Sequence, residues 1–197
     1  MNELNTLTDV ANLALARLGQ PSINSLDDTG SVAAAVRLVM KQAIRSEQRI
    51  ADWPELRQEI ELAKDATDHT DGRYRYALVP QWLAIRSADA EFARYAGWLL
   101  SEADPLTVTV TVYSEDVAAW STGLLECVSL ALAILIAPFL GRDTDAAQEI
   151  RAELERVARP RALTAAANSD SLEENPAGDV RNYRGSNSRR LNDSYLD

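Results

Sequence analysis

Residues 10–28 constrain the fold more than any other stretch, because they combine an amphipathic helix with a fixed stop. Thr8 is placed to accept a hydrogen bond from the free amides of the first helical turn. Gly19 follows the last apolar residue, where a left-handed cap is favoured, and Pro21 prevents the helix from continuing. The apolar positions recur at helical spacing: Ala11, Ala14, Leu15 and Leu18. The segment therefore predicts a helix, a rigid corner and an extended return.

Residues 31–51 predict a second, longer helix, with Glu47 as the one polar residue on its apolar face. Four basic residues lie four positions apart on another face: Arg37, Lys41, Arg45 and Arg49. A row of charges is usually a solvated face. The alternative is that the row contacts an acidic neighbour, such as another copy of this chain, which makes it a candidate subunit–subunit interface.

Residues 73–113 change character and predict a small antiparallel sheet. Residues 106–113 alternate between apolar residues and threonine, which is the clearest strand pattern in the chain. A hairpin is expected with its turn near Gly97. Three aromatic residues near this turn form either a docking surface at the exposed tip or part of the sheet core: Phe92, Tyr95 and Trp98. Residues 56–63 are consistent with a helix or a strand.

The next segment predicts a buried helix over residues 117–140, capped by residues 114–116 and too short in its apolar run to span a bilayer alone. Cys127 within it is expected to be a small core residue. Gly141 ends this helix, and Asp143 or Thr144 starts a final one over residues 145–167. The apolar stripe of that last helix is disturbed at Pro160 and comprises Ala147, Ile150, Leu154, Val157 and Leu163.

Residues 168–197 are polar and contain too few apolar side chains to form a core, so they predict an extended arm. Its anchors are Tyr183, Arg184, Arg189, Arg190 and Tyr195, residue types that are favoured in interfaces. The expected fold class is α+β, mainly α: a helical bundle with a small inserted antiparallel β-sheet and an extended C-terminal arm. The expected units are N-terminal bundle helices (1–72), the β region (73–113), C-terminal bundle helices (114–167) and the arm (168–197).

Charge and composition favour a structural protein over an enzyme. The net charge of −10 argues against a sequence-specific reader of duplex DNA. The single histidine, His69, leaves no histidine-based metal site or triad, and the single cysteine leaves no intrachain disulfide. We find no phosphate-binding glycine loop and no nucleophile elbow. The N-terminal residues predict no signal peptide, and no cofactor or metal is expected.

The motifs along the chain resemble, in order, the head-to-tail adaptor proteins of short-tailed bacteriophages, the tail tubular protein A type. The first motif is the helix that ends in Leu-Gly-x-Pro, followed by an isoleucine, Ser-Leu and acidic residues: Ala14, Leu15, Leu18, Gly19, Pro21, Ile23, Ser25 and Leu26. A long helix closing on Trp53 follows. Next come Tyr76-Ala77-Leu78 with Pro80 and Leu83, and then Tyr113, Asp116 and Trp120 before an apolar helix that ends at residues 137–141.

The resemblance implies a virion structural protein, assembled in the host cytoplasm, that forms a dodecameric ring beneath the portal protein. Such a ring extends the DNA channel and carries the tail nozzle protein, and the arm around residues 183–195 would bind the portal. The acidic charges of its copies would add in the lumen and let duplex DNA pass without sticking. No membrane is involved. The alternatives are a neck connector of a long-tailed phage, an acidic cell-wall glycan hydrolase associated with the tail, and a regulatory helical adaptor.

Overall fold

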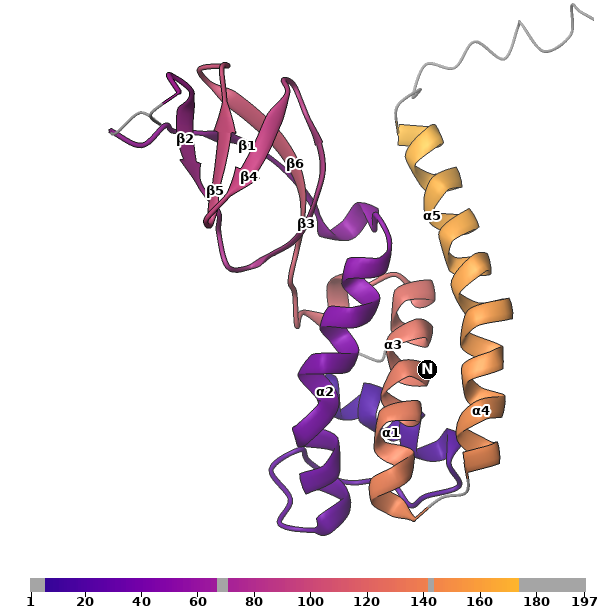
Figure 1. The fold of residues 1–197 in the computed structure, drawn as a ribbon. Helices are drawn as coiled ribbons and strands as arrows, with labels where there is room; N and C mark the ends of the chain where they lie inside the picture. Colours follow the sequence, from indigo (N-terminus) through magenta and orange to yellow (C-terminus); the bar gives the residue numbers. More distant parts are fainter. Residues whose placement is uncertain (1–5, 67–70, 142–143, 174–197) are drawn as a thin grey trace, which may run out of the picture.

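The computed structural model describes residues 6–66, 71–141 and 144–173, and it has mixed α and β architecture (Figure 1). About 51% of the chain is helical and 21% is in strands, which form two small antiparallel sheets. The helices make one body, and the sheets lie beyond the C-terminal end of the second helix (Figure 1). The mixed class expected from the sequence is therefore confirmed at this level.

The helical body is built around one central helix, α3, which packs against α1 and α2 and also against the C-terminal helices. Short 3-10 turns connect the longer elements, and a π turn joins the last two helices. The bounds are α1 Leu7–Arg17, α2 Ser31–Ile50, η1 Pro54–Leu56, η2 Val117–Ala119, α3 Thr122–Ile136, η3 Ala137–Leu140, α4 Thr144–Glu153, η4 Leu154–Ala158 and α5 Arg159–Glu173.

The N-terminal cap of α1 is Thr6, so the prediction of Thr8 is wrong. The Thr6 side chain accepts a hydrogen bond from the Asp9 amide, and the Asp9 carboxylate accepts one from the Thr6 amide. This reciprocal capping box needs an acidic residue three positions after the cap. Thr6 has Asp9 at that position, whereas Thr8 has Ala11.

The corner after α1 forms as the sequence predicts. Gly19 has φ 61°, in the left-handed region, and its amide donates to the Ala16 carbonyl. The Gln20 amide donates to the Leu15 carbonyl at 2.9 Å, which completes a Schellman motif. The extended return is then held by the Asn12 side-chain amide, which pairs with both backbone groups of Ile23.

The β region contains two three-stranded sheets, where the sequence predicted one. The orders are β1-β6-β3 and β2-β5-β4, and all pairs are antiparallel. The two sheets share a second core, because each sheet has an apolar face that a single sheet would leave in water. That core contains Leu62, Tyr76, Leu99, Leu106, Val108 and Val110. The strands are β1 Arg57–Leu62, β2 Tyr74–Ala77, β3 Trp82–Ala88, β4 Phe92–Tyr95, β5 Trp98–Ser101 and β6 Leu106–Val112.

Residues 56–63, which the sequence left open between helix and strand, contain strand β1. The β region therefore starts at Arg57 and not at residue 73. The residues of β1 pair in register with β6, from Arg57 opposite Thr111 to Leu62 opposite Leu106. Ile60 and Leu62 fall on the face that joins the second core. The hairpin turn expected near Gly97 is confirmed, since β4 and β5 pair on either side of it.

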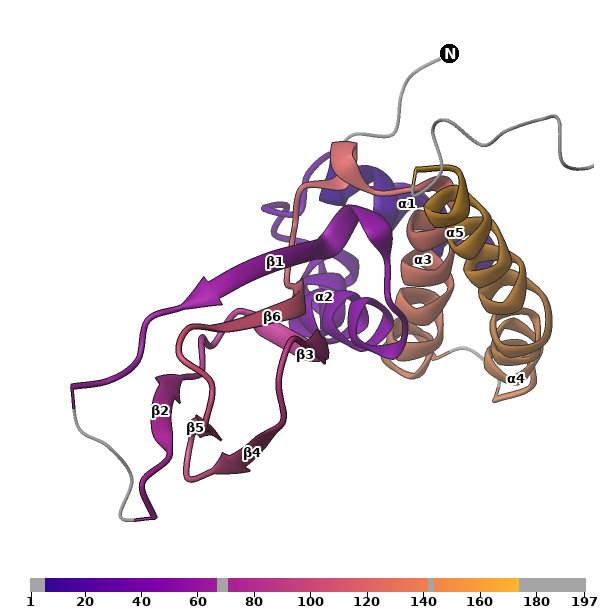
Figure 2. The same ribbon diagram turned by 90° about the horizontal axis from the view of Figure 1, so that it is seen from above.

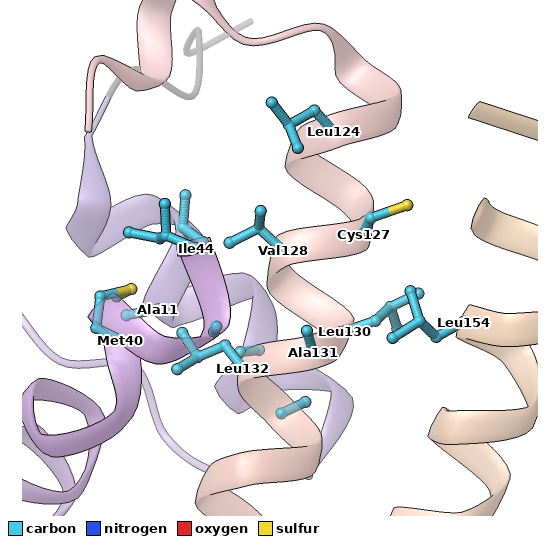
Figure 3. Close-up of a cluster of buried hydrophobic side chains, with 14 of the residues drawn as sticks. Ala11, Met40, Ile44, Leu124, Cys127, Val128, Leu130, Ala131, Leu132 and Leu154 are labelled. Carbon is cyan, nitrogen blue, oxygen red and sulfur yellow. The ribbon is translucent and has the colours of Figure 1, made fainter. Parts of the chain in front are cut away.

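Helix α3 is the buried central helix that the sequence predicts, but it starts later. Trp120 is in an extended conformation, which separates the η2 turn from the helix, and Ser121 caps α3 by accepting from the Leu124 amide at 3.2 Å. Val128 points toward Ile44 of α2, while Leu130 points toward Leu154 on the other side (Figure 3). Helices therefore cover α3 on both sides.

One segment of the described chain, Thr122–Leu140, is long and apolar enough to cross a membrane, with a mean hydropathy of 2.2. Within the protein, 56% of that window is already buried. The buried part is covered by the other helices of the body, so the segment is accounted for as the centre of the helical core. A core helix of this kind is hydrophobic on nearly all sides.

The C-terminal helix contains a π turn that shifts its apolar stripe. The Arg159 amide donates to the Leu154 carbonyl, five residues back, just before Pro160. The wider turn accommodates a proline, which has no amide to donate and whose ring would crowd the carbonyl four residues earlier. As a result Val157 is 54% exposed and Ala158 is 1% exposed. The assignment of Val157 to the buried stripe is therefore wrong.

The helix also continues to Glu173, past the predicted end at residue 167. Residues 168–173, which the sequence assigned to the arm, are thus helical. The remaining arm, with Tyr183, Arg184, Arg189, Arg190 and Tyr195, lies outside the described residues, as do His69 and Asp143.

Candidate functional site

The basic face of α2 is the strongest candidate for a functional surface. Arg37, Lys41, Arg45 and Arg49 are all exposed on it. The opposite face of the same helix is buried in the body and includes Val36, Ile44 and Glu47. This concentration of positive charge is notable in a chain whose net charge is −10. The structure shows that its four members have different surroundings.

Arg37 stabilises the corner that follows α1. Its guanidinium donates to the carbonyl oxygen of Leu26 and, at 2.9 Å, to that of Asp28. These bonds hold the loop that leads into α2 against the side of the helix. Arg37 therefore has an intramolecular function in the fold.

Lys41 and Arg45 lie over the ring of Tyr113, which follows β6. Their charged groups are 5.6 and 5.4 Å from the ring centroid, within the range of cation–π attraction. The Tyr113 hydroxyl donates to the carboxylate of Glu115. Burial, followed by the effect of Glu115, raises the pKa of Tyr113 well above its ordinary value, so the hydroxyl stays protonated.

Arg45 and Arg49 also line a hollow between α2 and the β region, which we call the arginine hollow. The third arginine in it is Arg94 of β4, next to the hairpin turn. The hollow has a volume of about 670 Å³, and its other lining residues are Gln42, Ser46, Trp82 and Leu83. No carboxylate is among the lining residues of this hollow. Among the described residues, none of the three arginines forms an ion pair.

Arg86 of β3 fixes the helix and the β region relative to each other. Its Nη2 donates to two carbonyls at the C-terminal end of α2, those of Arg49 at 3.1 Å and of the cap residue Ala51. Its Nε donates to Thr111 Oγ1 of β6 at 2.7 Å. A cation at a helix C-terminus is favoured by the helix dipole. Burial lowers the pKa of Arg86, and the nearby Asp52 opposes this effect.

Sequence reasoning missed both Arg86 and Arg94. Helical spacing can align Arg37, Lys41, Arg45 and Arg49, because they belong to one helix. It cannot indicate that an arginine from β4 closes the same hollow, since that contact depends on how the strands are placed against α2. The chain contains no local signal that would have identified either residue.

The hairpin tip is formed by Tyr95 and Trp98, which are paired across the turn. Ala96 and Gly97 between them have φ angles of 45° and 85°, as a type I′ turn requires. The Tyr95 side chain is 61% exposed. Together, Tyr95 and Trp98 form an aromatic pair on one face of the hairpin, while Arg94, which directly precedes Tyr95 and lines the arginine hollow, falls on the opposite face.

Phe92 does not belong to this tip, although the sequence grouped it there. It lies at the far end of the hairpin, opposite Ser101, and packs against the second core. An odd number of positions separates Phe92 from Tyr95, so the two side chains fall on opposite faces of the sheet. Of the two interpretations left open for the aromatic residues, the core applies to Phe92.

Cys127 is buried in the helical core beside α4 and α5 (Figure 3). Burial raises the pKa of its thiol to about 12, which keeps the sulfur protonated and unreactive at neutral pH. The described part of the chain contains no group of three histidine, cysteine or acidic side chains that could hold a metal ion.

The basic face of α2 and the arginine hollow are suited to binding anionic groups. Arginine guanidiniums bind carboxylates and phosphates through paired hydrogen bonds. No protein-family model matches this chain, and no curated protein is significantly similar to it in sequence.

Proposed function

We propose that the protein is a head-to-tail adaptor of a short-tailed bacteriophage, in which copies form a dodecameric ring beneath the portal protein. The ring would extend the DNA channel and carry the tail nozzle protein. In this proposal the fold is a helical bundle with an inserted β region and an extended C-terminal arm. The proposal rests on one observation. The motifs that resemble the adaptor family lie where one helix or strand ends and the next begins, at positions that we call the joints of the fold.

Three of these joints are sharply defined. Gly19 ends α1 with a positive φ and fixes the corner, and Gly141 ends η3 with a φ of 62°. Trp53 is fully buried at the end of α2, and its indole nitrogen donates to the Glu47 carbonyl at 2.9 Å. A motif placed at a joint determines the angle between two elements. A subunit whose shape must repeat around a ring depends on such angles.

The basic face of α2 supplies the proposed contact between subunits. Its exposed arginines have no described ion-pair partner, although the chain as a whole is strongly acidic. A neighbouring copy is a source of carboxylates at the high local concentration that a ring creates. Contacts of modest strength, repeated around a closed ring, stabilise the whole assembly.

The tip and the arm supply the other two proposed contacts. The exposed Tyr95 and the half-buried Trp98 would face the tail nozzle, since aromatic side chains are favoured in protein interfaces. The arm residues Tyr183 and Arg184, outside the described range, would bind the portal together with Arg189, Arg190 and Tyr195. The net charge of −10 on each copy would keep the DNA backbone from adhering to the lumen.

Electron microscopy of the purified chain, alone and mixed with the portal protein of the same virion, tests this proposal. The expected result is a ring of this protein stacked coaxially on the portal. Truncation after Glu173 keeps the whole described helix and should abolish attachment to the portal while the fold is retained. A chain that stays solitary and does not co-sediment with the portal would contradict the proposed function.

A further inference from the structure

The arginine hollow brings together like charges that lack a counter-ion. Arg45 and Arg49 are one helical turn apart, and Arg94 approaches them from β4. Like charges that line one hollow repel each other, and water screens part of this repulsion because all three arginines are exposed. An anion with oxygen atoms that accept paired hydrogen bonds from guanidinium would remove this repulsion. The chemistry of the hollow therefore suits carboxylate or phosphate groups.

Strand β1 presents the opposite charge on another side of the same molecule. Glu59 and Glu61 are both exposed and lie on the same face of β1. Within the described part of the chain, neither carboxylate has a hydrogen-bond or ion-pair partner. β1 pairs only with β6, so it is an edge strand of its sheet. Its outer edge and its two carboxylates are open to a partner.

The sheet order places these two surfaces on opposite sides. In the order β1-β6-β3, β1 is one edge and β3 is the other. The arginine hollow adjoins the β3 edge, because Trp82 and Leu83 of β3 line it. Figure 2 shows β1 and β3 on either side of β6, with α2 near β3. A contact between the two surfaces of one copy is thus prevented by the sheet itself.

The spacing of the charges is also complementary. Residues two apart on a strand are separated by about 6.7 Å along it, so Glu59 and Glu61 have that separation. Residues four apart on a helix are separated by about 6 Å along its axis, which applies to Arg45 and Arg49. The two carboxylates can therefore face the two guanidiniums one to one, and Arg94 remains to bind either carboxylate.

We infer that the arginine hollow of one copy receives Glu59 and Glu61 of the next copy, so that subunits meet head to tail. This inference rests on the proposed ring, because a ring brings successive copies side by side. Two different, complementary surfaces on one molecule make a heterologous contact, which closes into a ring when the rotation between copies permits it. The basic face of one copy thereby has a specific partner surface, the β1 carboxylates of the next copy.

Reciprocal charge reversal tests the inference. One variant carries Arg45→Glu and Arg49→Glu, and the other carries Glu59→Arg and Glu61→Arg. Each variant alone has like charges at both surfaces and should need at least about tenfold more protein to assemble than the native chain. A 1:1 mixture of the two should regain assembly, because each reversed surface then meets its complement. Mass measurement at low and high salt, with and without the portal, follows both effects.

Controls separate charge from folding. Arg151→Glu with Arg156→Glu changes the net charge by the same amount on exposed positions of α4 and η4 and should leave assembly unchanged. Arg45→Gln with Arg49→Gln removes the positive charge without introducing acids beside Tyr113, and it should weaken assembly if it folds. Circular dichroism and thermal unfolding establish that each variant is folded.

The outcomes distinguish the inference from the proposed function. If the native chain forms rings and both reversed variants do so equally, or if the folded mixture fails to reassemble, the inference is overturned while the ring stands. If the native chain stays solitary even with the portal, both fail. If Arg45→Glu with Arg49→Glu abolishes binding of a short DNA duplex while assembly is unaffected, the hollow binds phosphates, and the inference is again overturned.

Discussion

The guanidinium of Arg159 forms a bidentate ion pair with the carboxylate of Glu47 across the helical core, although the two residues are 112 positions apart in the chain. Arg159 Nη2 is 2.9 Å from Glu47 Oε1, and its Nε is 3.2 Å from Oε2. Glu47 is only 3% exposed. Burial raises the pKa of Glu47, and the hydrogen bonds and charge of Arg159 oppose this effect. The pair therefore explains why an acidic residue lies on the apolar face of α2.

Replacing Arg159 with methionine should lower the free energy of unfolding by about 3–5 kcal/mol, because Glu47 is left buried and unpaired. Without Arg159, the effect of burial on the pKa of Glu47 is unopposed. A carboxyl group whose pKa is higher in the folded state favours folding at low pH, and this stability is lost as pH rises through that pKa. Urea unfolding should thus find the variant more destabilised at pH 8 than at pH 5.

The double variant Glu47→Leu with Arg159→Met is the control for this prediction. It removes both charges and leaves no buried ion, so its stability should be within about 1 kcal/mol of the native value or above it. Equal losses in the single and double variants would show that packing, and not the unpaired charge, causes the effect.

Because of the π turn, two adjacent residues should respond differently to substitution by a charged residue. Val157→Glu should change stability by less than about 0.5 kcal/mol, since the side chain points to water. Ala158→Glu should lower it by several kcal/mol, or prevent folding, because it places a charge in the core. Thermal unfolding of the two variants measures both effects. A regular α-helix through this segment would reverse the order.

Gly123 allows α3 to approach α5 closely. A Cβ atom at this position would lie 2.7 Å from the Ala162 Cβ and 3.2 Å from its Cα. Gly123→Ala should therefore cost about 1–3 kcal/mol through overpacking. Adding Ala162→Gly removes the nearer clashing atom, so the two substitutions should couple favourably in a double-mutant cycle. If urea unfolding shows that the two changes in the free energy of unfolding simply add, the close approach of α3 and α5 is contradicted.

Gly19 should resist substitution because of its backbone conformation. A residue with a side chain in the left-handed region costs about 1–2 kcal/mol, and a β-branched residue costs more. Gly19→Val should therefore lower the melting temperature, and Gly19→Asn should lower it less, since asparagine tolerates this region. Gly30→Ser serves as the contrast. Gly30 caps α2 with a negative φ, and serine there adds a capping hydroxyl.

The sequence predicts the parts of this fold that local physics determines. The helix and corner around Gly19, the long α2, the buried α3 and the hairpin turn at Gly97 follow from periodicity and turn chemistry. The cap at Thr6 was also present in the sequence, since the capping box requires an acid three positions later. Its position was missed because Thr8 also precedes the helical pattern.

The remaining features depend on tertiary contacts. The exposure of Val157 follows from one extra residue in a π turn, which apolar spacing alone does not indicate. The division of the strands into two sheets depends on which strands share the second core. Likewise, Arg94 lines the same hollow as Arg45 and Arg49 only because of how the β region is placed against α2. Sequence spacing therefore identified one wall of the candidate site and missed the other.

Arg86 couples the helical body to the β region. Its guanidinium joins the end of α2 to Thr111 in the middle strand of the first sheet, so the helical body and the β region cannot tilt independently without breaking these bonds. The angle between the two halves is set inside each copy. Gln48 of α2 adds to this connection, because its side-chain amide pairs with both backbone groups of Ser114, so bending between the two halves is opposed by bonds within each copy.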